Sequence, residues 1–99
     1  MKLVWSERAI LRAGDEAAFI AIDNPTAARK WVQGLFKRAS ILRRFPHSGK
    51  KLPELNLDEF RELLYGHHRI IYRVGPKQAL ILTIRRTAQE LPAGDLTEE

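Results

Sequence analysis

The chain has 99 residues, enough for one domain with its own core, and no cysteine, which excludes a disulfide framework and thiolate metal ligands. Its formal charge is +5, but residues 1–89 hold 17 basic and 8 acidic residues and therefore carry +9, while residues 90–99 are acidic. A body this basic is expected to bind an anionic or acidic macromolecule, unless the excess arginine serves only solubility. We find no signal-peptide pattern and no apolar run of 18 residues, so we expect a soluble, cytoplasmic protein that does not associate with membranes.

The N-terminal segment predicts a strand followed by a helix. Lys2–Trp5 is a short apolar run, and Ser6 after it is a suitable N-cap. Apolar residues then recur with helical spacing from Glu7 to about Asp23. These residues are Ile10, Leu11, Ala17, Ala18, Phe19 and Ile22.

A second helix follows directly and completes a helical hairpin. Asn24 suits the N-cap and Pro25 the first helical position, where its missing N–H costs nothing. The helix is predicted to end near Phe45, before Pro46. Its apolar stripe indicates a buried face, made of Ala28, Trp31, Val32, Leu35, Ala39 and Leu42.

The second half of the chain predicts strands. Residues 46–58 carry two prolines and a glycine and are read as an irregular crossing. Three strands are expected at 60–65, 68–74 and 79–86, and their short connections imply an antiparallel meander. The predicted fold class is α+β, in the order β-α-α-β-β-β, with the hairpin on one face of a small antiparallel sheet. Residues 1–89 would form one domain, and residues 90–99 an acidic, loosely attached tail.

Strand alternation assigns the side chains to two faces of this sheet. In the middle strand His68, Ile70, Tyr72 and Val74 are expected to face the helices, which leaves Arg69 and Arg73 on the bare side. In the last strand we expect Leu80, Leu82 and Ile84 in the core and Ile81, Thr83 and Arg85 on the bare side.

Arginines would then gather on the bare face, where guanidinium groups suit phosphate and carboxylate partners. The predicted target-binding residues are Arg61, Arg69, Arg73, Arg85 and Arg86. In the alternative arrangement, these arginines pair with Glu59, Glu62 or the acidic tail.

Catalytic candidates are few. A ribonuclease would need proton-transfer groups near a phosphate-binding arginine. The candidates beside Arg61, Arg69 and Arg85 are His67, His68 and Glu54; the Lys50-Lys51 pair and His47 of the crossing segment are more simply read as solvated loop residues. Each histidine is equally explained as a turn or core residue. We find no metal-ligand spacing and no glycine-rich phosphate loop, so neither a metal nor a cofactor is expected.

The order of elements and the string Phe60-Arg61-Glu62-Leu63-Leu64 followed by His68-Arg69-Ile70-Ile71-Tyr72-Arg73-Val74 resemble the RelE/ParE toxins of bacterial type II toxin–antitoxin systems, closest to the ParE branch. The resemblance covers about residues 2–87. It implies a toxin held silent by a cognate antitoxin, as a possible hetero-oligomer.

The two branches of this family differ in target. RelE-like members are ribosome-dependent messenger RNA endonucleases, and ParE-like members poison DNA gyrase. Arg69 matches the arginine that RelE-like enzymes use against the scissile phosphate. The acid–base partners of that arginine are not matched. Phe60 and Glu62 occupy the positions where some RelE-like enzymes have lysines, and residues 86–89 lack the tyrosine or histidine of those enzymes. The resemblance therefore favours a gyrase-directed toxin that is not an enzyme, with an endoribonuclease or an inactive binding relic as the alternatives.

Overall fold

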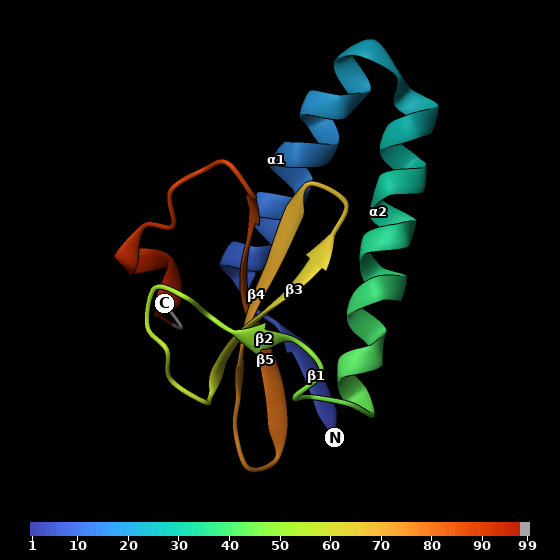
Figure 1. The fold of residues 1–99 in the computed structure, drawn as a ribbon. Coiled ribbons are helices and arrows are strands. Elements are labelled where there is room, and N and C mark those ends of the chain that lie inside the picture. The colour runs from blue at the N-terminus through green and yellow to red at the C-terminus, as the bar shows by residue number, and fades with distance from the viewer. Residues whose placement is uncertain (98–99) are drawn as a thin grey trace.

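The computed structural model describes residues 1–97 and has two helices packed on one face of a five-stranded sheet (Figure 1). Its elements are β1 (Lys2–Trp5), α1 (Glu7–Asp23), α2 (Pro25–Ala39), β2 (Lys50–Lys51), β3 (Phe60–Tyr65), β4 (His68–Val74), β5 (Gln78–Arg86) and two 3₁₀ helices, Ser40–Arg43 and Ala93–Leu96. The strand order is β1-β5-β4-β3-β2. The α+β fold is confirmed, although the sheet is mixed because β1 runs parallel to β5. The two-residue strand β2 lies in the segment expected to be irregular.

Both helix starts follow from their capping residues. Ser6 Oγ accepts a hydrogen bond from the backbone N–H of Ala9 at 3.0 Å, and Asn24 Oδ1 accepts one from Ala27 at 3.0 Å. α2 ends earlier than expected, at Ala39, and continues as a 3₁₀ helix. There the Ser40 hydroxyl donates to the Lys37 carbonyl at 2.6 Å, so the helix tightens before the chain turns.

The core lies between the helices and the sheet. From α2 and its 3₁₀ extension it takes Leu35, Ala39 and Leu42, as the predicted stripe requires. α1 contributes only Ala9 and Ala13, whose small side chains let the helix approach the sheet closely. The larger apolar residues that suggested the helical period are exposed: Ile10, Leu11, Phe19 and Ile22.

A β-bulge in β5 changes the predicted faces of that strand. Ile71 pairs with Thr83 and Tyr72 pairs with Ile81, so Leu82 is an extra residue between them. At the bulge, the alternation of β5 side chains between the two faces of the sheet shifts by one residue. The expectation that Ile81 points away from the helices is therefore wrong, and Ile81 is fully buried in the core together with Ile84.

The same shift overturns the core assignment of Leu80. It is only half-buried and lies outside the core cluster, because Ala79 rather than Leu80 faces the helices before the bulge.

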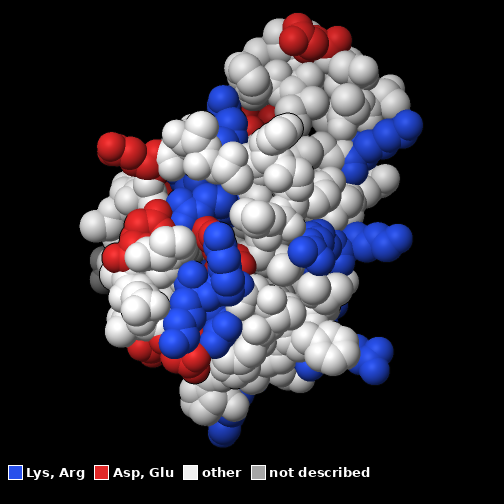
Figure 2. Space-filling view, viewed as in Figure 1, with Lys and Arg blue, Asp and Glu red and all other residues white. Residues whose placement is uncertain are grey.

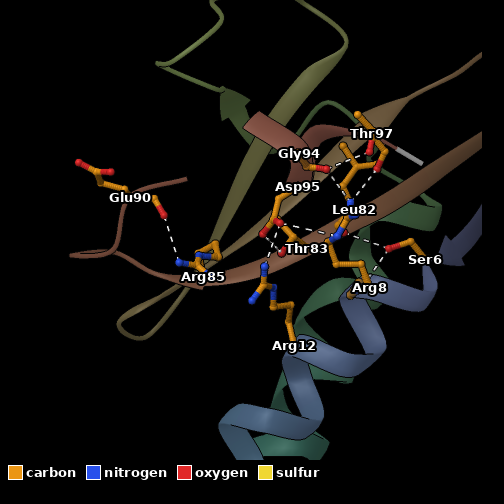
Figure 3. Close-up of polar contacts among 11 residues, drawn as sticks. Ser6, Arg8, Arg12, Leu82, Thr83, Arg85, Glu90, Gly94, Asp95 and Thr97 are labelled. Atoms are coloured by element: carbon orange, nitrogen blue, oxygen red, sulfur yellow. Dashed lines mark hydrogen bonds and ion pairs between the residues drawn. The ribbon is translucent and has the colours of Figure 1, made fainter. Parts of the chain in front are cut away.

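The acidic tail is docked rather than loose, as far as the described residues extend. It lies on the side of the sheet away from α2 (Figure 1). Asp95 is only 3% exposed, and its carboxylate accepts hydrogen bonds from Arg12 Nη2 and Thr83 Oγ1, both at 2.9 Å (Figure 3). Arg8 also donates to the Gly94 carbonyl at 2.7 Å. The expectation failed because it ignored the arginines of α1. Glu98 and Glu99 lie outside the described residues.

We predict that Asp95→Ala destabilises the domain by about 1–3 kcal/mol, because it leaves the buried Thr83 hydroxyl without its acceptor and separates the tail from α1. Urea denaturation followed by tryptophan fluorescence measures this loss. Glu90→Ala is the matched control, since it removes an exposed carboxylate from the same tail and should leave the midpoint nearly unchanged. Equal effects of the two substitutions would contradict a stabilising role for the contacts of Asp95.

Candidate functional site

Arg69 lies on the face of the sheet opposite the helices, but it is only 8% exposed. Its Nε atom donates to Glu62, and its two terminal nitrogens donate to the two oxygens of Glu54 at 2.8 and 2.9 Å. Lys50 Nζ lies 3.3 Å from the other oxygen of Glu62. We call these four residues the Arg69 cluster. The prediction that Arg69 stands free is wrong, because the 52–58 loop brings Glu54 over it and β3 supplies Glu62.

Two groups of this cluster, Glu54 and Arg69, stabilise each other's ionised forms. Hydrogen bonds from Arg69 lower the pKa of Glu54, although partial burial acts in the opposite direction. Glu54, and then Glu62, raise the pKa of Arg69 against the cost of burial. A phosphate would have to displace a bidentate carboxylate to reach this guanidinium.

The other predicted arginines also have partners, so the open arginine face does not exist in this structure. Arg61 donates to Asp58 at 2.6 Å and to the carbonyl of Gly49 at 2.8 Å, and its side chain is 13% exposed. Arg73 Nε lies 3.8 Å from a carboxylate oxygen of Glu59.

Arg85 and Arg86, at the end of β5, are held as well. Arg85 donates to the carbonyl of Glu90 at 3.2 Å. Arg86 donates to Glu16 at 3.1 Å and lies over the ring of Phe19. The structure thus has the alternative arrangement in which the arginines of the sheet pair with nearby acidic residues and the tail.

The histidines do not join Arg69. His68 faces the helices, where its Nε2 lies 2.8 Å from Glu16 Oε2 and its ring contacts Trp31. Burial opposes ionisation of Glu16, but hydrogen bonds from His68 and Arg86 outweigh it and lower the pKa of Glu16. His67 is an exposed turn residue. The structure therefore brings Glu54 to Arg69 and leaves both histidines elsewhere.

A second surface was missed by the reasoning on the strands. Residues 24–53 contain no Asp or Glu but eight of the 17 basic residues, and all eight are exposed. Figure 2 shows Lys and Arg side chains projecting over α2, on the right of the view, with no acidic side chain among them below the hairpin tip. The sequence contained this signal, because counting charge by segment rather than for the whole chain reveals it.

A third feature is an apolar groove on the helical hairpin, with a volume of about 530 Å³. Its lining is mostly small and apolar, with Ala17, Ala18 and Ala21 of α1 and Pro25, Ala28 and Val32 of α2, and it also includes the polar Arg29 and Gln33 of α2. On α1 the exposed side chains of Leu11 and Ile22 extend the apolar character of the hairpin.

Comparison with known proteins identifies the class. The family model of the ParE toxin of type II toxin–antitoxin systems, parDE, matches residues 3–91. The chain therefore belongs to the ParE toxin family.

Among solved structures, the chromosomal ParDE toxin–antitoxin system from P. aeruginosa is similar, with a TM-score of 0.73 and 24% identity over 87% of this chain and 95% of that one. At this identity the likeness shows the shared fold. A search of curated proteins gave no match.

Within residues 1–97, no group of three or more histidine, aspartate and glutamate side chains is arranged to hold a metal ion. None of the helices described here combines the length and apolar character needed to cross a bilayer.

We predict that Arg69→Ala destabilises the domain by about 3 kcal/mol, near the lower end for a broken buried ion pair, because Glu62 keeps Lys50 as a partner. Arg73→Ala is the matched control on the same strand, and its more exposed side chain should cost less than about 1 kcal/mol. Denaturant midpoints of the two variants give the comparison. If both unfold with the wild-type midpoint, the Arg69 cluster does not support the fold.

The lowered pKa of Glu54 predicts a pH-dependent contribution to stability. Its carboxylate stabilises the fold above its ordinary pKa of 4.5, and this contribution is lost as the pH falls through the lower value of the folded state. Glu54→Gln should therefore lower the free energy of unfolding at pH 7, and the difference from wild type should shrink below about pH 4.5. Denaturation at a series of pH values tests this. A difference that grows on acidification would be the wrong sign.

Proposed function

We propose that this chain is a ParE-like toxin that inhibits DNA gyrase and is neutralised by a cognate antitoxin. Membership of the ParE toxin family supports the toxin class. The observation that favours gyrase over messenger RNA is the state of Arg69, which is engaged by Glu54 and Glu62 rather than open to a phosphate.

The endoribonuclease alternative finds none of its predicted acid–base residues free beside Arg69. Glu54 is the one predicted acid–base candidate beside it, and this carboxylate is ionised and occupied by the guanidinium. General acid–base catalysis contributes about 10²–10⁴ in rate, so an arginine alone would cleave slowly. A gyrase inhibitor needs no such group, because it acts by binding.

The proposed antitoxin would bind as a protein partner in a hetero-oligomer. Exposed apolar surface commonly marks such interfaces, and the hairpin groove and the exposed Leu11 and Ile22 of α1 are surface of this kind. A gyrase target also implies a cytoplasmic location in a bacterial cell.

The test is a supercoiling assay with purified gyrase, relaxed plasmid and toxin freed of its antitoxin. We expect supercoiling to stop with toxin alone and to recover when the antitoxin is added. Toxin that arrests growth but leaves supercoiling intact would contradict the gyrase proposal. Codon-phased cuts in primer extension on translated messages would indicate the endoribonuclease instead, and unaffected growth an inactive relic.

A further inference from the structure

Unpaired positive charge is concentrated along α2 and the segment that follows it. Six basic residues form what we call the basic ridge: Arg29, Lys30, Lys37, Arg38, Arg43 and Arg44. All six are exposed, and none of them forms an ion pair with a carboxylate of residues 1–97. Their charge is therefore uncompensated in the described part of the molecule.

The rest of the molecule handles its arginines differently. Six of the nine basic residues outside residues 24–53 form ion pairs with carboxylates: Arg8, Arg12, Arg61, Arg69, Arg73 and Arg86. The contrast follows from the sequence, because no acidic residue occurs between Asp23 and Glu54. An anionic partner can therefore bind the ridge without first displacing a carboxylate of the protein from its basic side chains.

The spacing of the ridge suits a duplex. Its residues occur as three adjacent pairs, and the first two pairs are separated by eight residues, about 12 Å along an α-helix. The major groove of B-DNA is about 12 Å wide, so two pairs on one helix can reach phosphates on both sides of a groove. Arg38 is oriented by a hydrogen bond from its Nε to the Leu64 carbonyl at 2.9 Å, which leaves its terminal nitrogens available.

The ridge is chemically unlike a protein-binding surface. Stable protein interfaces have a buried apolar centre with aromatic or aliphatic anchors. Here Gln33 and Ser40 lie between the basic pairs. The exposed apolar side chains are Phe36, which packs on Trp5 with ring centroids 4.5 Å apart, and Phe45, whose ring contacts Arg44. Phosphate contacts need cations and polar groups and do not need such anchors.

We propose that the basic ridge binds duplex DNA through its phosphate backbone, without base recognition. This goes beyond gyrase inhibition as proposed above, since the contact requires no gyrase. The counterions released by phosphate contacts would make binding strongly salt-dependent, with about 0.9 in the slope of log K against log salt for each phosphate neutralised.

The experiment measures fluorescence anisotropy of a labelled 20-base-pair duplex with the full chain at several salt concentrations between 50 and 200 mM. The test variant is Lys30→Gln with Lys37→Gln, two exposed ridge lysines. The matched control is Lys2→Gln with Lys77→Gln, which removes the same charge from two exposed lysines of β1 and the β4–β5 turn. Thermal melts of both variants check that they are folded. Gyrase supercoiling is assayed in a separate experiment on the same variants.

The ridge variant should bind at least about 10-fold more weakly at 100 mM salt, with a salt slope smaller by about 1.8, while the control keeps the wild-type slope. Equal losses in the two variants would show that net charge alone is responsible and would overturn the assignment. Tighter binding to a single strand of equal length, or to poly-glutamate of equal charge, would also overturn it. None of these outcomes depends on gyrase inhibition, so the two proposals fail separately.

Discussion

The arrangement of this protein depends on how it neutralises arginine at its sheet. Arg69 is buried beside Glu62 and closed by Glu54, so the 52–58 loop is held against the sheet by charge as well as by the burial of Leu52. Asp95 does the same for the tail, and Glu16 for the end of β5. Buried charges are tolerated only when paired and hydrogen-bonded. The carboxylates that pair with these arginines come from α1, the 52–59 segment, β3 and the tail, whereas residues 24–53 contain none, so the basic side chains of α2 remain exposed to solvent.

This distribution separates three surfaces with different chemistry. The face around Arg69 is closed by ion pairs, the hairpin carries an apolar groove, and α2 with its extension is basic. The apolar and basic surfaces meet at Arg29, which lines the groove, and both are reached without opening the ion pairs around Arg69.

The fold could be read from the sequence because its signals are local. Ser6, Asn24 and Pro25 define helix starts by their own side chains, and period-two patterns define β3, β4 and β5. The bulge at Leu82 was not predictable, since no glycine or other local signal accompanies it. The tail was misjudged because the partners of Asp95 lie 83 and 12 residues away.

The pairing of Arg69 with Glu62 could have been predicted from the sheet. Arg69 pairs with Leu64, and Glu62 is two residues from Leu64 on the same face, the usual position for a diagonal cross-strand contact. The contact of Arg69 with Glu54 could not have been predicted, because it depends on the path of an irregular loop. Site prediction failed where it treated a face as bare without asking which loops cover it.

The parallel pairing of β1 with β5 has a consequence for synthesis. Lys2 pairs with Gln78, so β1 has no neighbour in the sheet until β5 has been synthesised. Contacts across such separations close slowly and leave apolar strand edges open meanwhile. A chain growing on the ribosome therefore cannot complete its sheet until β5 has emerged and β1 can pair with it.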